Sequence, residues 1–483
     1  MTRRWRRAAL WLLLCAWAGT ALWHTNKALP GGTQLASASC AVPAESVGFI
    51  ADVSAADAYG RPAVSQAVFD SVLAVVHGAR RFIVLDYHLF GTDGAGSAPR
   101  RALARELTDA LLAQKRAHPE LAVLFIMDPV NEGYGAARPQ EPALLRAADV
   151  SVVSTDLDVL RDSNYLYTSL WRLALRWWQP PGPLAREARG LNFKADHRKV
   201  ILADDGHGGL TGIVGSANPL DAQSGWSNLA VRVSGGPLGA LLESELAVAR
   251  FSGWRGAQAA FLPAEQAAAQ CHDAAAPGSA LTNSLVRVQL LTEGAIRAAL
   301  LAELGGTVRG DSIDLALYTL TDRDVVQALL DAARRGASVR LILDPSEDRT
   351  RLAPSGLPNQ AVASELVARS GGAIQVRWYR THGERFHGSL ALLSSPTRVW
   401  LTLGSANFTR RSLDDYDLEA NAALELTADA PLAEQARGYF EQLWGNRAGG
   451  GIEYTADFAV FADPSQADYW LGRLLEATGL SDF

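Results

Sequence analysis

Lysine is scarce among the basic residues of this chain. Only Lys27, Lys115, Lys194 and Lys199 occur among 45 basic residues, and arginine supplies the rest. No lysine follows Lys199, so the second half of the chain has no ammonium side chain at all. An excess of positive charge is also lacking, since the net charge is −6 and the isoelectric point is about 5.9. The sequence therefore has no basic footprint for duplex nucleic acid, which is not an expected partner.

Cysteine is scarce, and the three that occur are Cys15, Cys40 and Cys271. Neither a paired C-x-x-C arrangement nor an H-E-x-x-H motif is present, so the sequence predicts no metal site and no cofactor. Cys40 and Cys271 could form a disulfide in an oxidising compartment. Because two cysteines so far apart are a weak signal, the sequence leaves their pairing open.

A leader, over positions 1–30, precedes the folded part of the chain. Arg3, Arg4, Arg6 and Arg7 come first, and the apolar run Ala8–Trp23 follows them. This is the order of the n-region and h-region of a secretory leader, and the run is shorter than the roughly 20 residues of a typical spanning helix. A signal anchor and a cleaved signal peptide both fit. The arginine bias puts the remaining chain across the membrane, anchored or secreted, and the arginine-rich, lysine-poor usage suggests a bacterial gene.

A His-x-Lys-x4-Asp pattern is the first candidate for chemistry. His197 and Lys199 lie at the start of the strand-like run Val200–Leu202, and Asp204 follows. On a strand the two side chains point to the same face, because side chains alternate with a period of two. An imidazole beside an ammonium suits attack on phosphorus while a cation holds the phosphoryl oxygens. Taken alone, such a pattern is more often a solvated strand end.

The pattern recurs later in the chain, which argues against that bland interpretation. Gly215-Ser-Ala-Asn218 follows the first motif, and Gly404-Ser-Ala-Asn407 follows His387. The interval from His197 to His387 and the interval between the two tetrapeptides differ by a single position. The second copy is degenerate, since Ser389 and Ser394 stand where the first motif has its lysine and its aspartate.

These two motifs resemble the signature of the phospholipase D superfamily, in particular of a two-lobe, membrane-attached bacterial member with a degenerate second motif. The resemblance implies an α/β fold of two sandwich lobes related by a pseudo-twofold axis, with the active site between them. It also implies that one histidine attacks phosphorus and the other protonates the leaving oxygen, through a phosphohistidine intermediate. We assign His197 as the nucleophile and His387 as the acid, with the reverse assignment left open.

The resemblance assigns roles to the remaining motif residues. Lys199, Asn218 and Asn407 are expected to hold the phosphate. Ser216 and Ser405 are expected to shape the two Gly-Ser turns, and Glu419 to orient one imidazole. Asp204 is grouped with the catalytic motif but is expected to act as a structural hydrogen-bond acceptor. Loss of the second lysine removes charge-assisted bonds of about 1.5–3 kcal/mol, a handicap rather than a loss of activity. Four arginines are candidates to replace it, each otherwise a solvated surface charge: Arg380, Arg385, Arg410 and Arg411.

Strand and helix patterns alternate in both halves of the chain, as expected for α/β lobes. The expected elements are strands at 82–90, 121–127, 313–318 and 339–343 and helices at 101–118 and 324–335. We expect a first lobe over residues 45–270, a second over 285–447 and a C-terminal tail over 448–483.

The first lobe carries an insertion relative to the second, which we place at Tyr165–Arg189. As a helix, this segment would place Leu166, Leu170, Ala174 and Trp177 on one apolar face. Two interpretations stand: a helix packed on the lobe, or a lipid-facing wall beside the active site.

Three hypotheses for function follow. The first is an enzyme that hydrolyses or transfers phospholipid headgroups, with phospholipid as substrate and the membrane as partner. The second is a nuclease-type phosphodiesterase of the same superfamily, against which the acidic charge counts. The third is a catalytically weak scaffold that binds lipid or a partner. The sequence indicates neither the headgroup nor the oligomeric state.

Overall fold

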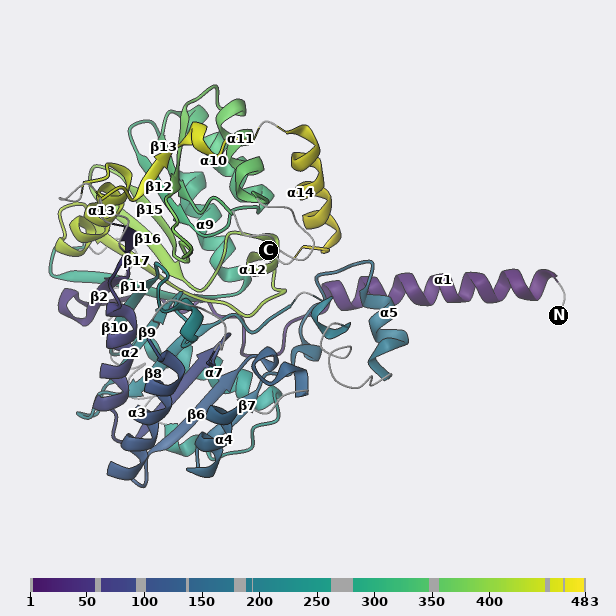
Figure 1. Ribbon diagram of the computed structural model, residues 1–483, viewed down its shortest axis with the longest axis horizontal. Helices are drawn as coiled ribbons and strands as arrows, with labels where there is room; N and C mark the ends of the chain where they lie inside the picture. Colours follow the sequence, from purple (N-terminus) through teal and green to yellow (C-terminus); the bar gives the residue numbers. More distant parts are fainter. Residues whose placement is uncertain are drawn as a thin grey trace.

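The computed structural model places two β-sheets at the centres of two lobes, one above the other in Figure 1. It describes residues 3–56, 62–92, 101–135, 139–177, 188–192, 194–261, 281–346, 356–447, 452–463 and 465–481.

The first lobe is built on a seven-stranded mixed sheet. In spatial order its strands are β2 (Val47–Ala51), β10 (Leu229–Ser234), β9 (Leu210–Gly215), β8 (Lys199–Asp204), β5 (Phe82–Tyr87), β6 (Ala122–Met127) and β7 (Ser151–Ser154). The last three strands are parallel to one another, and the others pair antiparallel. Every residue of β5 and of β8 is buried, as expected for central strands covered on both faces.

The second lobe is built on a nine-stranded sheet. In spatial order its strands are β1 (Cys40–Pro43), β11 (Leu285–Thr292), β17 (Ala420–Thr427), β16 (Arg398–Gly404), β15 (Ser389–Ser394), β12 (Ser312–Leu317), β13 (Ser338–Leu343), β14 (Ile374–Tyr379) and β18 (Thr455–Asp457). Both edge strands come from outside the range expected for this lobe. β1 precedes the first lobe in sequence, and β18 belongs to the segment that the sequence describes as a tail.

Strand order and strand direction repeat between the two sheets. The series β10-β9-β8-β5-β6-β7 corresponds to β17-β16-β15-β12-β13-β14, and in each series only the last three strands are parallel. The prediction of two α/β lobes of the same architecture is confirmed. The first motif starts β8 and the second starts β15, so the two motifs occupy equivalent positions.

Helices cover both faces of each sheet. In the first lobe α2 (Ala67–Gly78), α3 (Leu103–Ala117) and α4 (Gln140–Ala147) pack on one face, and α7 (Leu238–Phe251) packs on the other. In the second lobe α9 (Gly294–Gly306), α10 (Arg323–Arg335) and α11 (Asn359–Arg369) share one face, and α13 (Pro431–Trp444) takes the other. The short helix α12 (Arg410–Leu413) follows β16, and α14 (Gln466–Thr478) ends the fold.

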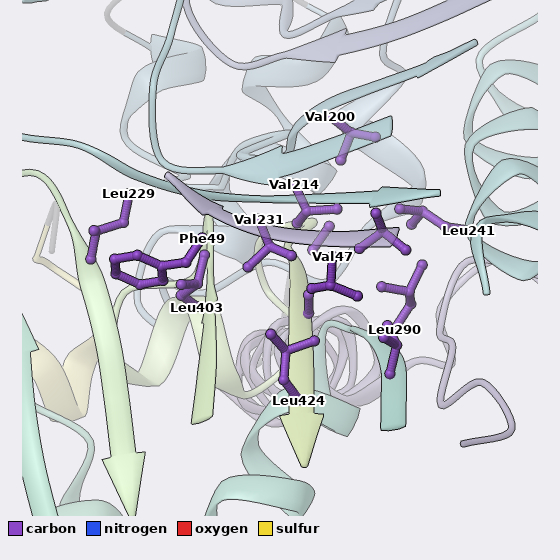
Figure 2. Close-up of a cluster of buried hydrophobic side chains, with 14 of the residues drawn as sticks. Val47, Phe49, Val200, Val214, Leu229, Val231, Leu241, Leu290, Leu403 and Leu424 are labelled. Atoms are coloured by element: carbon purple, nitrogen blue, oxygen red, sulfur yellow. The ribbon is translucent and has the colours of Figure 1, made fainter. Parts of the chain in front are cut away.

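One apolar core joins the two lobes and fixes their relative position. Val47, Phe49 and Val231 of the first sheet pack against Leu403 and Leu424 of the second (Figure 2). All five side chains are buried, with exposed fractions of 6% or less. The two lobes are therefore held by a continuous hydrophobic interface, which positions the two motifs relative to each other.

The leader forms a helix, α1 (Arg3–Asn26), which projects away from both lobes (Figure 1). Its residues Arg4–Asn26 are long and apolar enough to cross a membrane, and only 6% of the apolar window is buried. Cys15, within α1, is free, and Cys40, downstream of the helix, is disulfide-bonded. Cys271 lies outside the described residues.

The insertion begins with a short helix, α5 (Thr168–Leu173), and a 3-10 turn, η4 (Leu175–Trp177). The continuous helix expected from the sequence is interrupted at Ala174, and residues 178–187 lie outside the described part. Arg172 at the end of α5 does not face solvent, but is drawn into the lobe by a buried ion pair with Asp162.

Candidate active site

His197 is held by a carboxylate from the opposite lobe. Its Nδ1 atom lies 2.9 Å from Oε1 of Glu419, which immediately precedes β17 and is fully buried. The other carboxylate oxygen of Glu419 accepts a hydrogen bond from Ser405 Oγ. The backbone amide of His197 donates to the carbonyl oxygen of Leu418 at 2.9 Å, which adds a second link across the lobes. The second Gly-Ser turn thus orients the first histidine through Glu419.

His387 has the same arrangement with one chemical difference. Its Nδ1 atom lies 3.2 Å from Oδ1 of Asn228, and Ser216 Oγ donates to the same oxygen at 3.0 Å. Its backbone amide donates to the carbonyl oxygen of Ser227 at 2.8 Å. Asn228 therefore occupies the position that Glu419 occupies beside the first histidine, and it supplies an amide in place of a carboxylate.

Both imidazoles share one electrostatic environment. Burial lowers the pKa of His197 well below its ordinary value, and the positive charge of Lys199 lowers it further. Burial, Lys199 and His197 itself lower the pKa of His387 in the same way. The structure therefore brings the two motif histidines into one site, where burial and Lys199 favour the neutral form of both imidazoles. With Nδ1–H donated to Glu419 or to Asn228, the Nε2 lone pair of each ring is available.

Lys199 is the buried cation of the first motif. Its side chain is 2% exposed, and Nζ donates to the carbonyl oxygen of His197 at 2.6 Å. Burial lowers the pKa of Lys199 to about 8, and the nearby Glu419 opposes that shift. Burial likewise raises the pKa of Glu419 to about 7, against the effect of Lys199.

Ser389 occupies the equivalent position in the second lobe. It pairs with Leu317 at the end of β12, as Lys199 pairs with Tyr87 at the end of β5. Of the four arginines considered as replacements, Arg385 lies near the second histidine. Its guanidinium carbon lies 5.1 Å from the ring centroid of Trp226 and 6.0 Å from that of Tyr318, and both rings contact His387. Its charge contributes to the lowered pKa of His387. Its Nη1 atom donates to the hydroxyl of Tyr318 at 2.7 Å.

The other three arginines have different surroundings. The charge of Arg411 acts on His197, and its Nη2 atom pairs with Asp417 at 3.2 Å. Arg410 donates to the carbonyl oxygens of Ser163 and Glu476, while Arg380 forms an exposed ion pair with Glu453. Arg385 is therefore the replacement candidate that lies at the second histidine.

Three rings that the sequence did not predict, those of Trp226, Tyr318 and His88, lie beside the two motif histidines. Trp226 and Tyr318 each place a ring centroid 5.2 Å from that of His387, while His88 lies 4.8 Å from His197. His88 and Tyr318 are equivalent, since each follows a central strand and donates its amide to the residue after the motif histidine. Tyr318 ends the strand expected at 313–318, which was a signal for it, whereas His88 lies inside the strand expected at 82–90 and had none.

Asp204 does not lie with the histidines. It ends β8, five residues beyond Lys199, which is about 16 Å along a strand. Its carboxylate accepts backbone hydrogen bonds from Arg80, Arg81 and Phe82 at 2.8–3.2 Å. Asp204 therefore holds the start of β5, and its place in the motif reflects folding rather than a share in the reaction.

The two asparagines of the Gly-Ser turns differ in their surroundings. Asn218 is buried, its Oδ1 accepts from the amide of Leu89 at 3.1 Å and its Nδ2 donates to Gln223 at 2.9 Å. It fixes the loop that follows β5, next to His88. Asn407, by contrast, is partly exposed.

A buried ion-pair network lies behind the first motif. Arg198 pairs with Glu293 of the second lobe at 2.7 Å and with Glu245 at 3.2 Å. Glu293 in turn accepts the backbone amide of Glu419 at 3.1 Å. Arg198 therefore helps to position Glu419, the partner of His197, through Glu293. Within the described ranges, no group of three or more histidine, cysteine or acidic residues is placed to hold a metal ion.

Residues 300–444 match the family model described as "Cardiolipin synthase, PLD-like domain". This range contains His387, Ser405, Asn407 and Glu419, so the match covers most of the second lobe. No curated protein sequence matches the chain.

Solved structures with a similar fold include a phosphatidylserine synthase from Haemophilus influenzae Rd KW20. It is 13% identical, has a TM-score of 0.55, and the match covers 96% of this chain and 97% of that chain. This likeness establishes the fold over nearly the whole length. A polyphosphate kinase from Porphyromonas gingivalis is 12% identical, with 90% and 53% coverage and a TM-score of 0.43. The phospholipase D family member Nuc from Salmonella typhimurium is 22% identical, with 36% and 97% coverage and a TM-score of 0.27.

Proposed function

We propose that this chain, which belongs to the phospholipase D superfamily, cleaves a phosphodiester bond of phospholipid headgroups and passes the phosphatidyl group to water or to an alcohol. The observation that carries the proposal is the pair of Nδ1-tethered histidines, one on each lobe, with the buried Lys199 close enough for its charge to act on both imidazoles. Tethering at Nδ1 leaves Nε2 of each imidazole for bond formation or proton transfer.

The first step is attack of His197 Nε2 on phosphorus. A nitrogen–phosphorus bond forms, the phosphorus–oxygen bond to the leaving group breaks, and His387 Nε2 delivers its proton to the departing oxygen. The imidazole then carries positive charge, which the carboxylate of Glu419 stabilises through Nδ1–H. Asn228 gives His387 no such compensation, so the arrangement favours His197 as the nucleophile.

The second step reverses the roles. Water or an alcohol loses its proton to His387 as its oxygen attacks phosphorus, and the nitrogen–phosphorus bond breaks to restore His197. His387 must be protonated when the first step begins, although its pKa is low in the empty site. A phosphodiester anion that arrives beside Lys199 offsets the positive charge that lowers this pKa, so substrate binding favours proton uptake.

Phospholipid is the proposed substrate class because of α1. An apolar helix whose apolar window is only 6% buried supports a position of the two lobes at a membrane surface. The four arginines before the apolar run favour an orientation in which most of the chain lies outside the cytoplasm and faces the periplasm or the exterior. A C-terminal reporter that is active only in the cytoplasm tests this orientation, and its activity would reverse it.

The experiment that tests the proposal compares substrates. The purified full-length protein is incubated with mixed phospholipid vesicles and, separately, with single-stranded DNA, and released headgroup and nucleotide are measured. Release of headgroup, absent in His197→Ala, is the expected result. Release of nucleotide alone would replace the proposal with a nuclease function, and release of neither would leave a binding scaffold.

A further inference from the structure

The end of α1 is part of the folded first lobe. The carbonyl oxygen of His24 accepts the amide of Asp162 at 3.0 Å, and Thr25 is only 1% exposed. Lys27 Nζ donates to the carbonyl oxygen of Asp158 at 3.0 Å, and Arg161 Nε donates to the carbonyl oxygen of Lys27 at 2.7 Å. These contacts fix the direction in which α1 leaves the lobe, so α1 is joined to it rigidly.

The insertion helix α5 lies alongside the apolar part of α1 (Figure 1). Ser169 Oγ donates to the carbonyl oxygen of Trp17 at 2.6 Å. Trp17 lies six residues before Trp23, which is about 9 Å along the helix axis. If Trp23 marks the membrane interface, as tryptophan commonly does, α5 lies about 9 Å inside it.

Buried charges hold the inner face of α5. Arg172 and Lys194 pair with Asp162 at 2.8 and 2.6 Å, and all three side chains are at most 4% exposed. Burial would raise the pKa of Asp162, but the charges of Lys194 and Arg172 lower it below its usual range. This ionic cluster fixes the rotation of α5, and therefore also fixes which of its residues point outwards.

The outward residues are large and apolar. Leu166, Leu170, Leu173 and Trp177 have exposed fractions of 60%, 38%, 49% and 76%. Leu170 and Leu173 lie three residues apart on α5 and share one face of it. Leu166 before the helix and Trp177 in η4 lie exposed at the two ends of this face. The apolar residues of α1 from Leu10 to Trp17 are also exposed. α1 and α5, which contact each other at Trp17 and Ser169, thus both present apolar side chains to the outside.

We propose that α5 and η4 enter the bilayer that α1 crosses, with the face Leu166, Leu170, Leu173 and Trp177 on the acyl chains. The depth of about 9 Å matches the roughly 5–10 Å at which interfacial helices lie. Arg176, over the ring of Trp177 at 5.6 Å, stands at the polar edge of this face. The insertion and the anchor form one membrane-embedded unit, which requires that α1 is retained in the mature protein.

This unit bears on the active site, and in that respect the inference rests on the proposed function. Lys194, which anchors α5 through Asp162, precedes His197 by three residues. The Nζ–carboxylate contact therefore links the embedded helix to the segment that carries the nucleophile. The lobes are held at a fixed distance from the bilayer, and the substrate is a lipid of that same bilayer rather than one delivered from solution.

Lipid contact can be measured without any activity. The full-length Cys15→Ser protein is reconstituted in nanodiscs, and single cysteines are introduced by Leu170→Cys, Leu173→Cys and, as a matched control, Leu144→Cys. Leu144 lies on α4 of the same lobe and is 44% exposed, close to the 49% of Leu173. Each variant is labelled with an environment-sensitive fluorophore, and the Cys15→Ser parent provides the blank.

The expected result is quenching of the labels at 170 and 173 by spin-labelled lipid and protection from iodide, with the reverse at 144. Equal behaviour at the three positions would overturn the proposal. Intact mass measurement of the membrane fraction is the second readout. A mature chain that begins after residue 26 would also overturn the proposal, because the anchor would then be absent.

Aspartates introduced on the apolar face of α5 test whether membrane contact of this helix affects the reaction. Leu170→Asp/Leu173→Asp should turn over phospholipid in vesicles at least tenfold more slowly than wild type, while hydrolysis of a soluble aryl phosphodiester stays unchanged. Leu144→Asp should change neither. Equal loss on both substrates would contradict a membrane role. If wild type proves inactive on every substrate, the quenching experiment still decides the membrane contact by itself.

Discussion

The Nδ1 atom of His197 lies 2.9 Å from Oε1 of Glu419, a hydrogen bond that crosses from the first lobe to the second. The corresponding bond of His387 runs in the opposite direction, from the second lobe to the first, and ends on the amide of Asn228. Each lobe therefore completes the histidine of the other. The two halves of the site are geometrically alike but chemically different, and the proposed mechanism uses this difference to give the two histidines different roles.

Glu419→Gln should lower turnover without removing the hydrogen bond. The amide keeps an acceptor near Nδ1 but cannot offset the positive charge that His197 gains as it bonds to phosphorus. A charge-assisted hydrogen bond contributes about 1.5–3 kcal/mol, so the expected loss in kcat/KM is about ten- to a hundredfold. Steady-state rates on an aryl phosphodiester measure it. A loss of less than twofold would show that Glu419 does not act on the nucleophile.

Asn228→Asp should shift the pH dependence of the reaction. A carboxylate at this position, 3.2 Å from Nδ1 of His387, would raise the pKa of that imidazole, because a negative charge stabilises its protonated form. Because the acid form of His387 persists below its pKa, activity on phospholipid should then extend to higher pH. Hydrolysis of an aryl phosphodiester, whose leaving group needs no proton, serves as the control. A profile that does not move on phospholipid would argue against His387 as the acid.

The alkaline side of the wild-type profile should report Lys199. Its pKa of about 8 means that the ammonium is present below that pH and is lost as the pH rises through it. We expect kcat/KM to fall about ten- to a hundredfold across this range, as the phosphoryl oxygens lose their cation. Lys199→Arg keeps the charge at all these pH values, so the fall near pH 8 should disappear even if the rate is lower. A fall that persists in Lys199→Arg belongs to another group.

Arg385→Gln should slow the reaction more than Arg380→Gln does. Arg385 lies at the second histidine, whereas Arg380 forms an exposed pair with Glu453, so the second variant is a matched control. If Arg385 acts in place of the missing lysine, Ser389→Lys should restore activity to Arg385→Gln and change the wild type little. Equal rates for Arg385→Gln and Arg380→Gln would exclude Arg385 from the site.

The local patterns of the chain gave a good account of its elements. The strand expected at 121–127 is β6 (Ala122–Met127), and the helix expected at 324–335 is α10 (Arg323–Arg335). Long apolar runs with regular periods determine such elements by themselves. The short strands β1 and β18 were not predicted, because a strand of three or four residues exists only by pairing with a partner distant in sequence.

Only those residues of the candidate site that belong to the two sequence motifs could be predicted. His197, Lys199 and His387 stand out by their spacing, whereas Asn228 and His88 reach the site through tertiary contacts that no local pattern encodes. Asn228 nonetheless had a signal, because it follows Ser216 at nearly the interval at which Glu419 follows Ser405.

The environment of Arg172 could not be predicted from the insertion segment alone. The carboxylate that buries it, that of Asp162, lies outside the helix. The helical period predicted that Leu170 is on an apolar face, but neither the break at Ala174 nor the ion pair that orients α5.

The most direct test of the central claim is trapping of the phosphoenzyme. Full-length wild type and His197→Ala are mixed with a phosphodiester that carries an activated aryl leaving group and labelled phosphorus, and the reaction is stopped in alkali, in which phosphohistidine survives. The account predicts acid-labile label bound to wild type, no label on His197→Ala, and aryl release at least a thousandfold slower in the variant. Equal aryl release by the two purified proteins would contradict it.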